Sequence, residues 1–484
     1  MEKHYDAAVS ETADCSSGLS DGASFDEKAT KRLIRKIDLV LLPLLSILYL
    51  LSFLDRSNIG NARLAGLEHD LHLKGLMYNA AVAVFFPPYA AAEIPSNIIM
   101  KRLRPSIWIP SMMIAWSIVC VCIGLVRNYA GLLVARAFLG FTEGGLFPGI
   151  TFFITTWYKR DECGLRLAIF YSSATAAGAF GGLLARGLMQ MKGVGGKSGW
   201  SWIFIIEGLL TFLVALGAYF WMQDYPDTAG FLTEAERKEV KRRLETDRDF
   251  LADEYNTMFV WQALKDWKVY MFAFISCCLA LPTYSVSLFL PTIVRDLGYK
   301  NTTAQLMTTP PYLLACFLCI VGGYTADKMK TRGPFMIGFS LVGMIGFIIL
   351  LTSHDLHVKY AGCFFVTSGL FPSVPQGLAW ASVNVGGTLK RSVSIATFVM
   401  FANVSALSSA FIFLPRFAPL YRTSFSILLS TTSAGCALSI YMTYWFRREN
   451  ARREAIKPKA TYTEAEMHAQ REMGDHAGFW RYTT

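Results

Sequence analysis

The stretch YAGLLVARAFLGFTEGGLFPGITFFITTWY, residues 129–158, is an almost unbroken apolar run that carries one arginine, Arg136, and one glutamate, Glu143. It is long enough to cross a bilayer as a helix. Ionisable side chains at bilayer depth are costly and usually face a protein-lined or watery interior. Arg136 and Glu143 are seven residues apart, which places them on one face of a helix. The run therefore predicts a transport pathway, with a structural ion pair between helices as the alternative.

Runs of spanning length recur along the whole chain. Of its 484 residues 53% are hydrophobic and 17% are charged, which is typical of a polytopic membrane protein. Twelve spans are predicted, at residues 37–60, 77–99, 106–126, 129–157, 166–189, 202–222, 269–294, 306–325, 334–352, 360–384, 392–414 and 424–446. The predicted fold is an all-α membrane protein with twelve transmembrane helices.

The longest polar interruption divides these spans six and six. The predicted parts are a disordered cytoplasmic N-terminal tail (1–36), an N-terminal six-helix half (37–222), a cytoplasmic linker (223–267), a C-terminal six-helix half (268–446) and a cytoplasmic C-terminal tail (447–484). In the linker, Thr233 and Glu236 fit a capping box that opens a charged helix running to about Asp249. Two halves of six helices are typical of secondary transporters.

Lysine and arginine gather before the first predicted span and after the second, fourth and eighth. This bias predicts that both termini are cytoplasmic, and it accounts for most of the net charge of +10, so a nucleic-acid partner is not expected. The cysteine pairs fall within predicted spans without histidine or acidic residues at ligand spacing, so we expect no metal and no cofactor. No phosphate-binding loop or nucleophile and base constellation indicates an enzyme. The sequon at Asn301 lies close to the membrane, and we expect it to be unused.

Two motifs resemble those of the major facilitator superfamily. Gly323, Asp327, Lys328 and Arg332 are similar to its loop motif, which latches helices together and would act here as a gate. Arg136, followed at four-residue intervals by Gly140 and Gly144, resembles the fourth-helix motif, whose arginine takes part in proton coupling. The first half carries only the basic part of the loop motif, at 101–104.

A closer resemblance is to the fungal allantoate permease family of anion:cation symporters. The segments that carry it are LDRSNIGNA (54–62), EIPSN (93–97), WYKRDECGLR (157–166), WIFIIEG (202–208), FLTE (231–234), NVGGTLKR (384–391) and GDHAGFWRY (474–482). The resemblance implies proton-coupled uptake of a small organic anion, such as a ureide, nicotinate or another vitamin carboxylate. It also implies a plasma-membrane location, and we expect a monomer in the lipid bilayer.

The same resemblance assigns roles to four charged residues. It implies that Asp55 and Glu143 are proton sites, that Arg56 clamps the substrate carboxylate, and that Arg136 tunes Glu143. It places Asp55 and Arg56 together in the central cavity, whereas hydropathy alone would leave this pair at the membrane interface. An anion bound at Arg56 would remove counter-charge from a nearby carboxylate, which then takes up a proton more readily. By linkage, protonation would tighten anion binding.

Other candidate residues are polar or aromatic. Substrate contacts are predicted at Tyr49, Tyr89, Asn384 and Asn403, and further cavity candidates are Phe85, Phe86, Tyr284, Phe289 and Gln376. Helix packing is the alternative for all of them. Glu93 and Glu207 are interpreted as packing or anchoring acids.

Three functions compete on the sequence. The leading one is a proton-coupled importer of an organic anion. The second is an exporter of a drug or secondary metabolite by proton antiport, which the lack of a Gly-Pro element in the fifth span disfavours. The third is a nutrient sensor that binds without transporting, but the tails and the linker offer no interaction domain.

Overall fold

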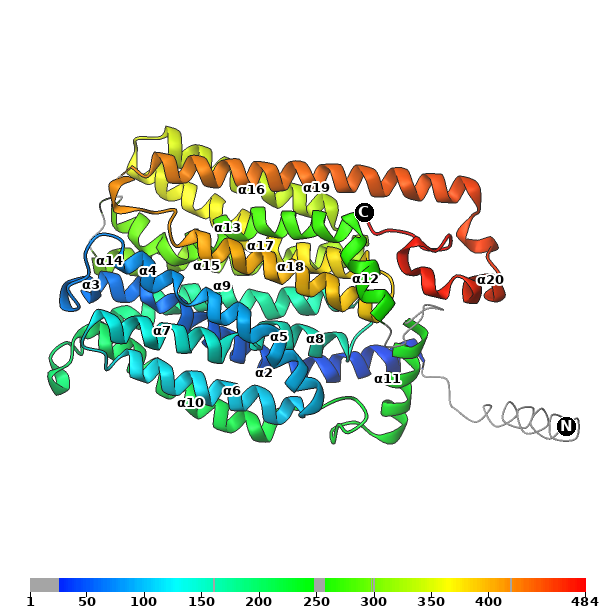
Figure 1. Cartoon of the computed structure of the whole chain (residues 1–484), viewed down its shortest axis with the longest axis horizontal. Coiled ribbons are helices and arrows are strands. Elements are labelled where there is room, and N and C mark those ends of the chain that lie inside the picture. The colour runs from blue at the N-terminus through cyan, green and yellow to red at the C-terminus, as the bar shows by residue number, and fades with distance from the viewer. Residues whose placement is uncertain (1–25, 160–161, 248–256, 297, 299–300, 418–419) are drawn as a thin grey trace, which may run out of the picture.

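The computed structural model describes residues 26–484 except 160–161, 248–256, 297, 299–300 and 418–419, and every regular element in that part is a helix (Figure 1). The first half consists of α2 (Glu27–Leu64), α3 (Leu67–Asp70), α4 (Met77–Ala83), α5 (Phe86–Arg102), α6 (Pro105–Ile123), α7 (Tyr129–Glu143), α8 (Leu146–Thr155), α9 (Cys163–Met189) and α10 (Gly199–Trp221). The linker contains α11 (Glu234–Asp247) and α12 (Thr257–Lys265). The remaining helices are α13 (Trp267–Asp296), α14 (Asn301–Met307), α15 (Thr309–Met329), α16 (Gly333–Thr352), α17 (Leu356–Val383), α18 (Thr388–Ser409), α19 (Arg422–Ile456) and α20 (Glu464–Ala469).

The long helices lie side by side as a bundle, with α3 and α14 at one end and α11, α12 and α20 at the other (Figure 1). We call these the far end and the linker end. Ten described helical segments are long and apolar enough to cross a membrane. The other two predicted spans correspond to α4 with α5 and to α17. The predicted all-α fold is confirmed.

Proline pairs interrupt the second helix of each half. Pro87 and Pro88 begin α5 just after a break from α4, and Pro310 and Pro311 begin α15 just after α14. A proline lacks the N–H that would bond to the preceding turn, so it is tolerated at a helix start and breaks a helix interior. The two breaks occupy equivalent places in the two halves.

The predicted boundary of the N-terminal tail is wrong. Residues 27–36 are not disordered but form the first turns of α2, while residues 1–25 lie outside the described part. The helix extends this far because Leu33 is buried and Lys36 forms an ion pair with Glu236 of α11 at 2.7 Å. Thr233 and Glu236 exchange the two hydrogen bonds of a capping box at the start of α11.

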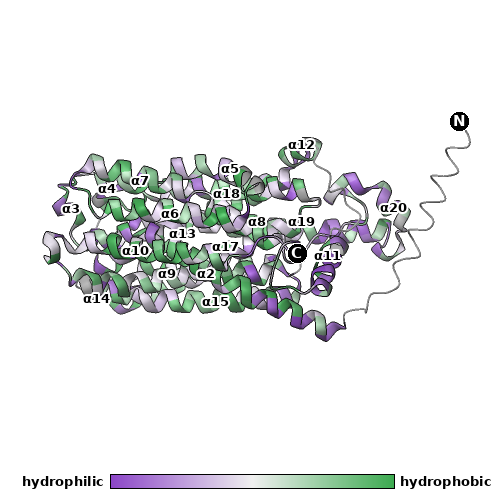
Figure 2. Ribbon diagram, turned by 90° about the horizontal axis from the view of Figure 1, so that it is seen from below, coloured by the Kyte–Doolittle hydropathy of each residue, from purple (hydrophilic) through white to green (hydrophobic). Residues whose placement is uncertain are grey.

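Apolar residues cover the outside of the bundle as well as its interior. Figure 2 shows hydrophobic residues along the helices, and hydrophilic ones gathered at the linker end. Phe220 and Trp221 of α10 are 84% and 68% exposed, which a lipid environment would accommodate. The halves meet where α9 packs on α15, α2 on α13 and α5 on α18.

The tail after α19 folds back onto the linker end of the C-terminal half. We call residues 471–484 the tail segment. Arg453 of α19 donates to the carbonyl oxygens of Asp475, Ala477 and Trp480, and the Tyr482 ring stacks on Phe446 with centroids 4.7 Å apart. No signal in the sequence predicted this packing.

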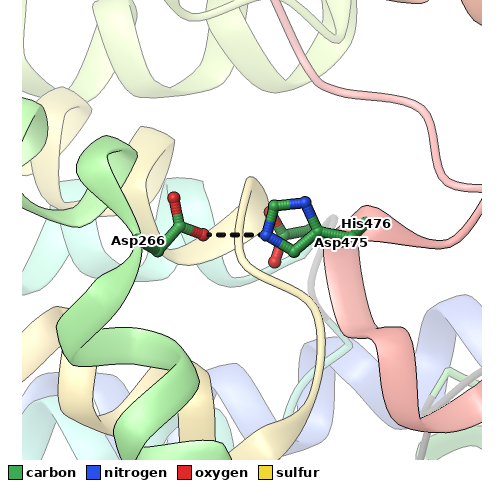
Figure 3. A group of neighbouring side chains, drawn as sticks. All are labelled: Asp266, Asp475 and His476. Atoms are coloured by element: carbon green, nitrogen blue, oxygen red, sulfur yellow. Dashed lines mark ion pairs between the residues drawn. The ribbon is translucent and has the colours of Figure 1, made fainter.

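A buried cluster of four charges, which we call the ion quartet, anchors the tail segment. Lys390 of α18 lies 2.7 Å from Asp266 and 2.5 Å from Asp475, and Lys268 of α13 pairs with the same two carboxylates. None of the four side chains is more than 2% exposed. His476 lies 3.6 Å from Asp266 at the edge of the quartet (Figure 3). Oxygen and nitrogen atoms of Asp266, Asp475 and His476 are close enough to suit a metal, but two ammonium groups already lie against the carboxylates, so we assign the cluster to ion pairing.

Candidate functional site

A cavity lies between the two halves near the middle of the bundle. Residues that line it include Tyr49, Arg56, Tyr89, Phe147, Tyr171, Thr283, Tyr284, Gly377 and Asn403. They come from α2, α5, α8 and α9 of the first half and from α13, α17 and α18 of the second. The wall is therefore aromatic and apolar, and Arg56 brings it a positive charge.

Arg56 and Glu143 form the ion pair of this cavity. Arg56 Nη2 lies 2.7 Å from Glu143 Oε1, and the side chains are 6% and 0% exposed. Ser52 Oγ donates to the same carboxylate oxygen at 2.5 Å. The guanidinium lies over the rings of Phe85 and Tyr89, 5.1 and 4.7 Å from their centroids. Arg56 Nε and Glu143 Oε2 are buried without a hydrogen-bond partner, so the pair has a free donor and a free acceptor.

Arg136 does not pair with Glu143 directly. Its Nε donates to the carbonyl of Ala81 at 3.3 Å, and its guanidinium lies 5.1 Å from the centroid of Phe85. No ion pair to Arg136 occurs in the described part of the chain, and Glu143 pairs with Arg56 instead. The Phe85 ring thus lies against both buried arginines. The ion pair between helices that was the alternative is formed by Glu143 with Arg56 of α2.

Asp55 points away from the cavity, which corrects the expectation that it accompanies Arg56 there. Trp116 Nε1 and Thr211 Oγ1 donate to its carboxylate at 3.2 and 3.0 Å, and Cys120 Sγ lies at 3.5 Å. The physical reason is helical geometry, because adjacent residues point about 100° apart. Its role in proton coupling stays a prediction.

The predicted substrate contacts divide into two groups. Tyr49, Tyr89 and Asn403 line the cavity. Asn384 does not: its amide donates to the carbonyls of Trp380 and Thr483 and accepts from the Thr483 N–H, so it caps α17 with the tail segment. A substrate role for Asn384 is therefore wrong.

Among the further candidates, Tyr284 lines the cavity, and Phe85 and Phe86 pack behind it. Phe289 packs on Phe413 and Tyr78 instead. Sequence reasoning missed Ser52, Phe147 and Tyr171. Ser52 could have been found, because it precedes Arg56 by four residues on the same helical face.

Contacts between the halves close the cavity toward the linker end. Asn403 donates to Glu93 at 2.8 Å. Asp327 accepts from the Leu165 N–H of α9 at 2.6 Å and forms an ion pair with Arg332. Gly323 packs closely against Ala168, whereas Lys328 is exposed and takes no part in these contacts. The gating role of this motif stays a prediction.

Contacts between the halves also close the far end. Asn79 donates to the carbonyl of Ala410 at 2.6 Å, and Thr309 donates to that of Ala179 at 3.1 Å. Contacts between the two halves therefore lie on both sides of the central cavity.

The fold and the cavity between the two halves agree with a match to a family model. Residues 45–410 match the model described as Major Facilitator Superfamily. The chain belongs to the major facilitator superfamily. It is a multi-pass membrane transporter, and its relatives are transporters rather than enzymes.

Relatives of this superfamily member include fungal transporters. It is 35% identical over 461 residues to an uncharacterised transporter of Schizosaccharomyces pombe, covering 94% of each chain. It is 33% identical over 427 residues to the high-affinity nicotinic acid transporter of Saccharomyces cerevisiae, covering 88% of this chain and 80% of that one. Among solved structures, a bacterial homologue of the human lysosomal transporter Spinster, inward-facing and occupied, matches with a TM-score of 0.57 at 17% identity over 83% of this chain and 94% of that one. This structural match shows the fold alone.

Gly140 allows α7 to pack closely against Phe85, the ring that lies against both arginines of this superfamily member. A Cβ on Gly140 of α7 would collide with the backbone carbonyl of Phe85. We expect Gly140→Ala to displace α5, to cost about 1–3 kcal/mol and to lower uptake more than it lowers the amount of folded protein. Gly338→Ala is the control, because a Cβ there meets open space. Equal uptake per folded molecule for the two variants would contradict the prediction, and fluorescence-detected size exclusion with uptake measures both quantities.

Proposed function

We propose that this transporter takes up a small organic anion together with protons, and that the anion is a nicotinate-like, allantoate-like or vitamin-like carboxylate. The observation that carries the proposal is the Arg56 guanidinium in an aromatic cavity between the two halves, with Glu143 as its one ion-pair partner among the described residues. We further propose that it works in the plasma membrane with the linker end in the cytoplasm, which the distribution of basic residues supports.

Arg56 is suited to the recognition of a carboxylate. A guanidinium presents donors in a planar arrangement that matches two carboxylate oxygens. Its Nε is buried and without a hydrogen-bond partner, so this donor is available to a ligand. The rings of Tyr49, Tyr89 and Tyr284 offer flat apolar surface for the remainder of the substrate. The similarity to a nicotinic acid transporter supports an aromatic carboxylate as the first compound to test.

The Arg56 and Glu143 pair couples the anion to a proton. An anion that binds Arg56 competes with Glu143 for the same guanidinium. A buried carboxylate that loses its counter-charge is strongly destabilised until it is protonated. Glu143 therefore takes up a proton as the anion binds, and by linkage a protonated Glu143 leaves Arg56 free for the anion. Arg136 tunes this exchange from beyond Phe85, and Asp55 provides a second proton site on the same helix as Arg56.

Alternating access then requires that the inter-half contacts open one end at a time. Breaking the hydrogen bond between Glu93 and Asn403 and the contacts of Asp327 would open the linker end and release the anion there. Asn403 lines the cavity, so the anion can compete for its amide and weaken this gate.

The test is uptake of radiolabelled nicotinate, allantoate, pantothenate, biotin and small dicarboxylates in cells that lack their own transporters. We expect accumulation of one panel member that is faster at acidic than at neutral pH and is abolished by a protonophore. An uptake rate that changes neither with pH nor with the protonophore would rule out proton coupling. Absence of any uptake despite surface expression would shift the assignment to export or to sensing.

A further inference from the structure

Glu207 of α10 is a buried acid that has no part in the cavity. Its side chain is 1% exposed, and it lies against Asn58 of α2 within the N-terminal half. Asn58 Nδ2 donates to Glu207 Oε2. No lysine or arginine in the described part of the chain forms an ion pair with Glu207. The titratable groups that act on it from the neighbouring helices are Asp55 of α2 and Cys120 of α6.

The hydrogen bonds between Glu207 and Asn58 are incomplete unless one more proton is present. Glu207 Oε1 and Asn58 Oδ1 are both buried, and neither has a hydrogen-bond partner. Both atoms are acceptors if Glu207 is ionised, and each buried unpaired acceptor costs about 1–3 kcal/mol. A proton on Glu207 turns one acceptor into a donor, so that the acid and the amide can exchange two hydrogen bonds. An ionised Glu207 would instead be a buried charge without a cation, close to a second carboxylate.

The same two helices form a second polar contact one turn away. Thr211, four residues after Glu207, donates to Asp55 at 3.0 Å, and Asp55 is three residues before Asn58. The contacts of Asn58 with Glu207 and of Asp55 with Thr211 therefore lie one above the other between antiparallel helices. Asn58 lies nearer than Asp55 to the far-end terminus of α2, so the Glu207 contact is the outer one.

We propose that Glu207 is a third proton-binding site of the N-terminal half and supplies Asp55 with a proton. The inference rests on the proposed proton coupling and extends it. The proton leaves the Glu207 carboxylic acid, the Asp55 carboxylate receives it, and a proton from the far end restores Glu207. Glu207 would thus hold a proton between the far side of the membrane and the two proposed proton sites, Asp55 and Glu143. Asn58 is a positioning residue that stabilises the neutral acid.

The first readout is infrared difference spectroscopy of the full-length protein in liposomes at neutral pH, without substrate. We expect Glu207→Gln to remove one carboxylic-acid carbonyl band that wild type shows. Glu236→Gln is the control, because Glu236 is an ion-paired carboxylate at the linker end and should contribute no such band. An acid band of equal size in wild type and Glu207→Gln would overturn the proposal. This readout needs no transport, so it is separate from a failure of the proposed function.

The second readout is uptake as a function of pH. We expect Glu207→Gln, which keeps the size and stays neutral, to lose the acid stimulation of uptake seen in wild type. A pH profile identical to that of wild type, together with a lost acid band, would show a structural acid and would overturn the supply role. Asn58→Leu should weaken the acid stimulation in the same direction, since it removes the partner that holds the neutral acid.

Discussion

Arg56→Ala should abolish anion uptake at every pH, while Arg63→Ala should leave most of it. Truncation of one partner of a buried charge pair costs about 2–5 kcal/mol, because the other charge stays buried and unpaired. A loss of this size in binding corresponds to at least about a thirtyfold drop in uptake at low substrate. Glu143 loses its cation, and under the proposed function the substrate loses its guanidinium in the same change.

Arg63 is a matched control on the same helix. It stacks on Tyr78 with its guanidinium 4.4 Å from the ring centroid and pairs with Glu68 at 2.9 Å, outside the cavity. Arg56→Lys separates charge from geometry, since an ammonium keeps the charge and loses the planar two-point arrangement. We expect it to be folded, present at the surface and nearly inactive. Normal uptake by a surface-expressed Arg56→Ala would exclude Arg56 as the anion clamp.

Lys390→Met should destabilise the protein by about 3–5 kcal/mol. The substitution removes one cation of the ion quartet and leaves Asp266 and Asp475 to share Lys268. The double variant Lys390→Met with Asp475→Asn removes one charge of each sign, and it should recover much of the loss. Thermal unfolding in detergent, followed by fluorescence, measures both effects. A double variant no more stable than the single one would contradict the charge argument.

Lys457→Met is the exposed counterpart. Lys457 pairs with Glu466 at 2.6 Å, but the two side chains are 32% and 44% exposed. Exposed pairs contribute about 0–1 kcal/mol, so its unfolding temperature should hardly change. The comparison separates the effect of burial from that of removing any lysine in this region.

The ion quartet also predicts how the stability depends on pH. Burial raises the pKa of the Asp475 carboxyl, but the ammonium groups of Lys268 and Lys390 outweigh that effect, so this pKa lies below its ordinary value. Such a carboxyl contributes stability that is complete above its unfolded-state pKa, near 3.9, and is lost as the pH falls toward the folded-state pKa. The unfolding temperature of wild type should therefore drop between about pH 5 and pH 3. Lys390→Met should lose less over the same interval, because part of the contribution is already gone.

The sequence predicted the fold and part of the site for physical reasons. Long apolar runs can be recognised one at a time, so the helices were predictable without any knowledge of their partners. Glu143 was predictable because a charge inside such a run is exceptional. Arg56 was predicted only from the family resemblance, since hydropathy alone leaves it at the membrane interface. Which face of α2 meets the cavity was not predictable, since polar residues occupy both faces, and Asp55 was therefore misplaced.

Long-range contacts explain the remaining errors. Asn384 looked like a free polar group within a span, and only the folded chain brings Thr483 to its amide. Phe147 and Tyr171 are common residues in membrane helices, and nothing in their spacing separates a cavity wall from packing. The ion quartet joins residues as far apart in sequence as Lys268 and Asp475. No pattern in the sequence links these two residues, so their contact could not be predicted.

The tail segment also sets an order of events during synthesis. Lys268 and Asp475 are 207 residues apart, so at about 5–20 residues per second the ribosome needs roughly 10–40 s to deliver the second after the first. Through that interval Asp266, two residues away and 3.3 Å from Lys268 in the folded protein, is the partner at hand. When Lys390 emerges, one carboxylate faces two ammonium groups until the tail arrives. A premature stop before codon 475 would make that imbalance permanent. The product would be a nearly full-length chain whose second half cannot complete its folding.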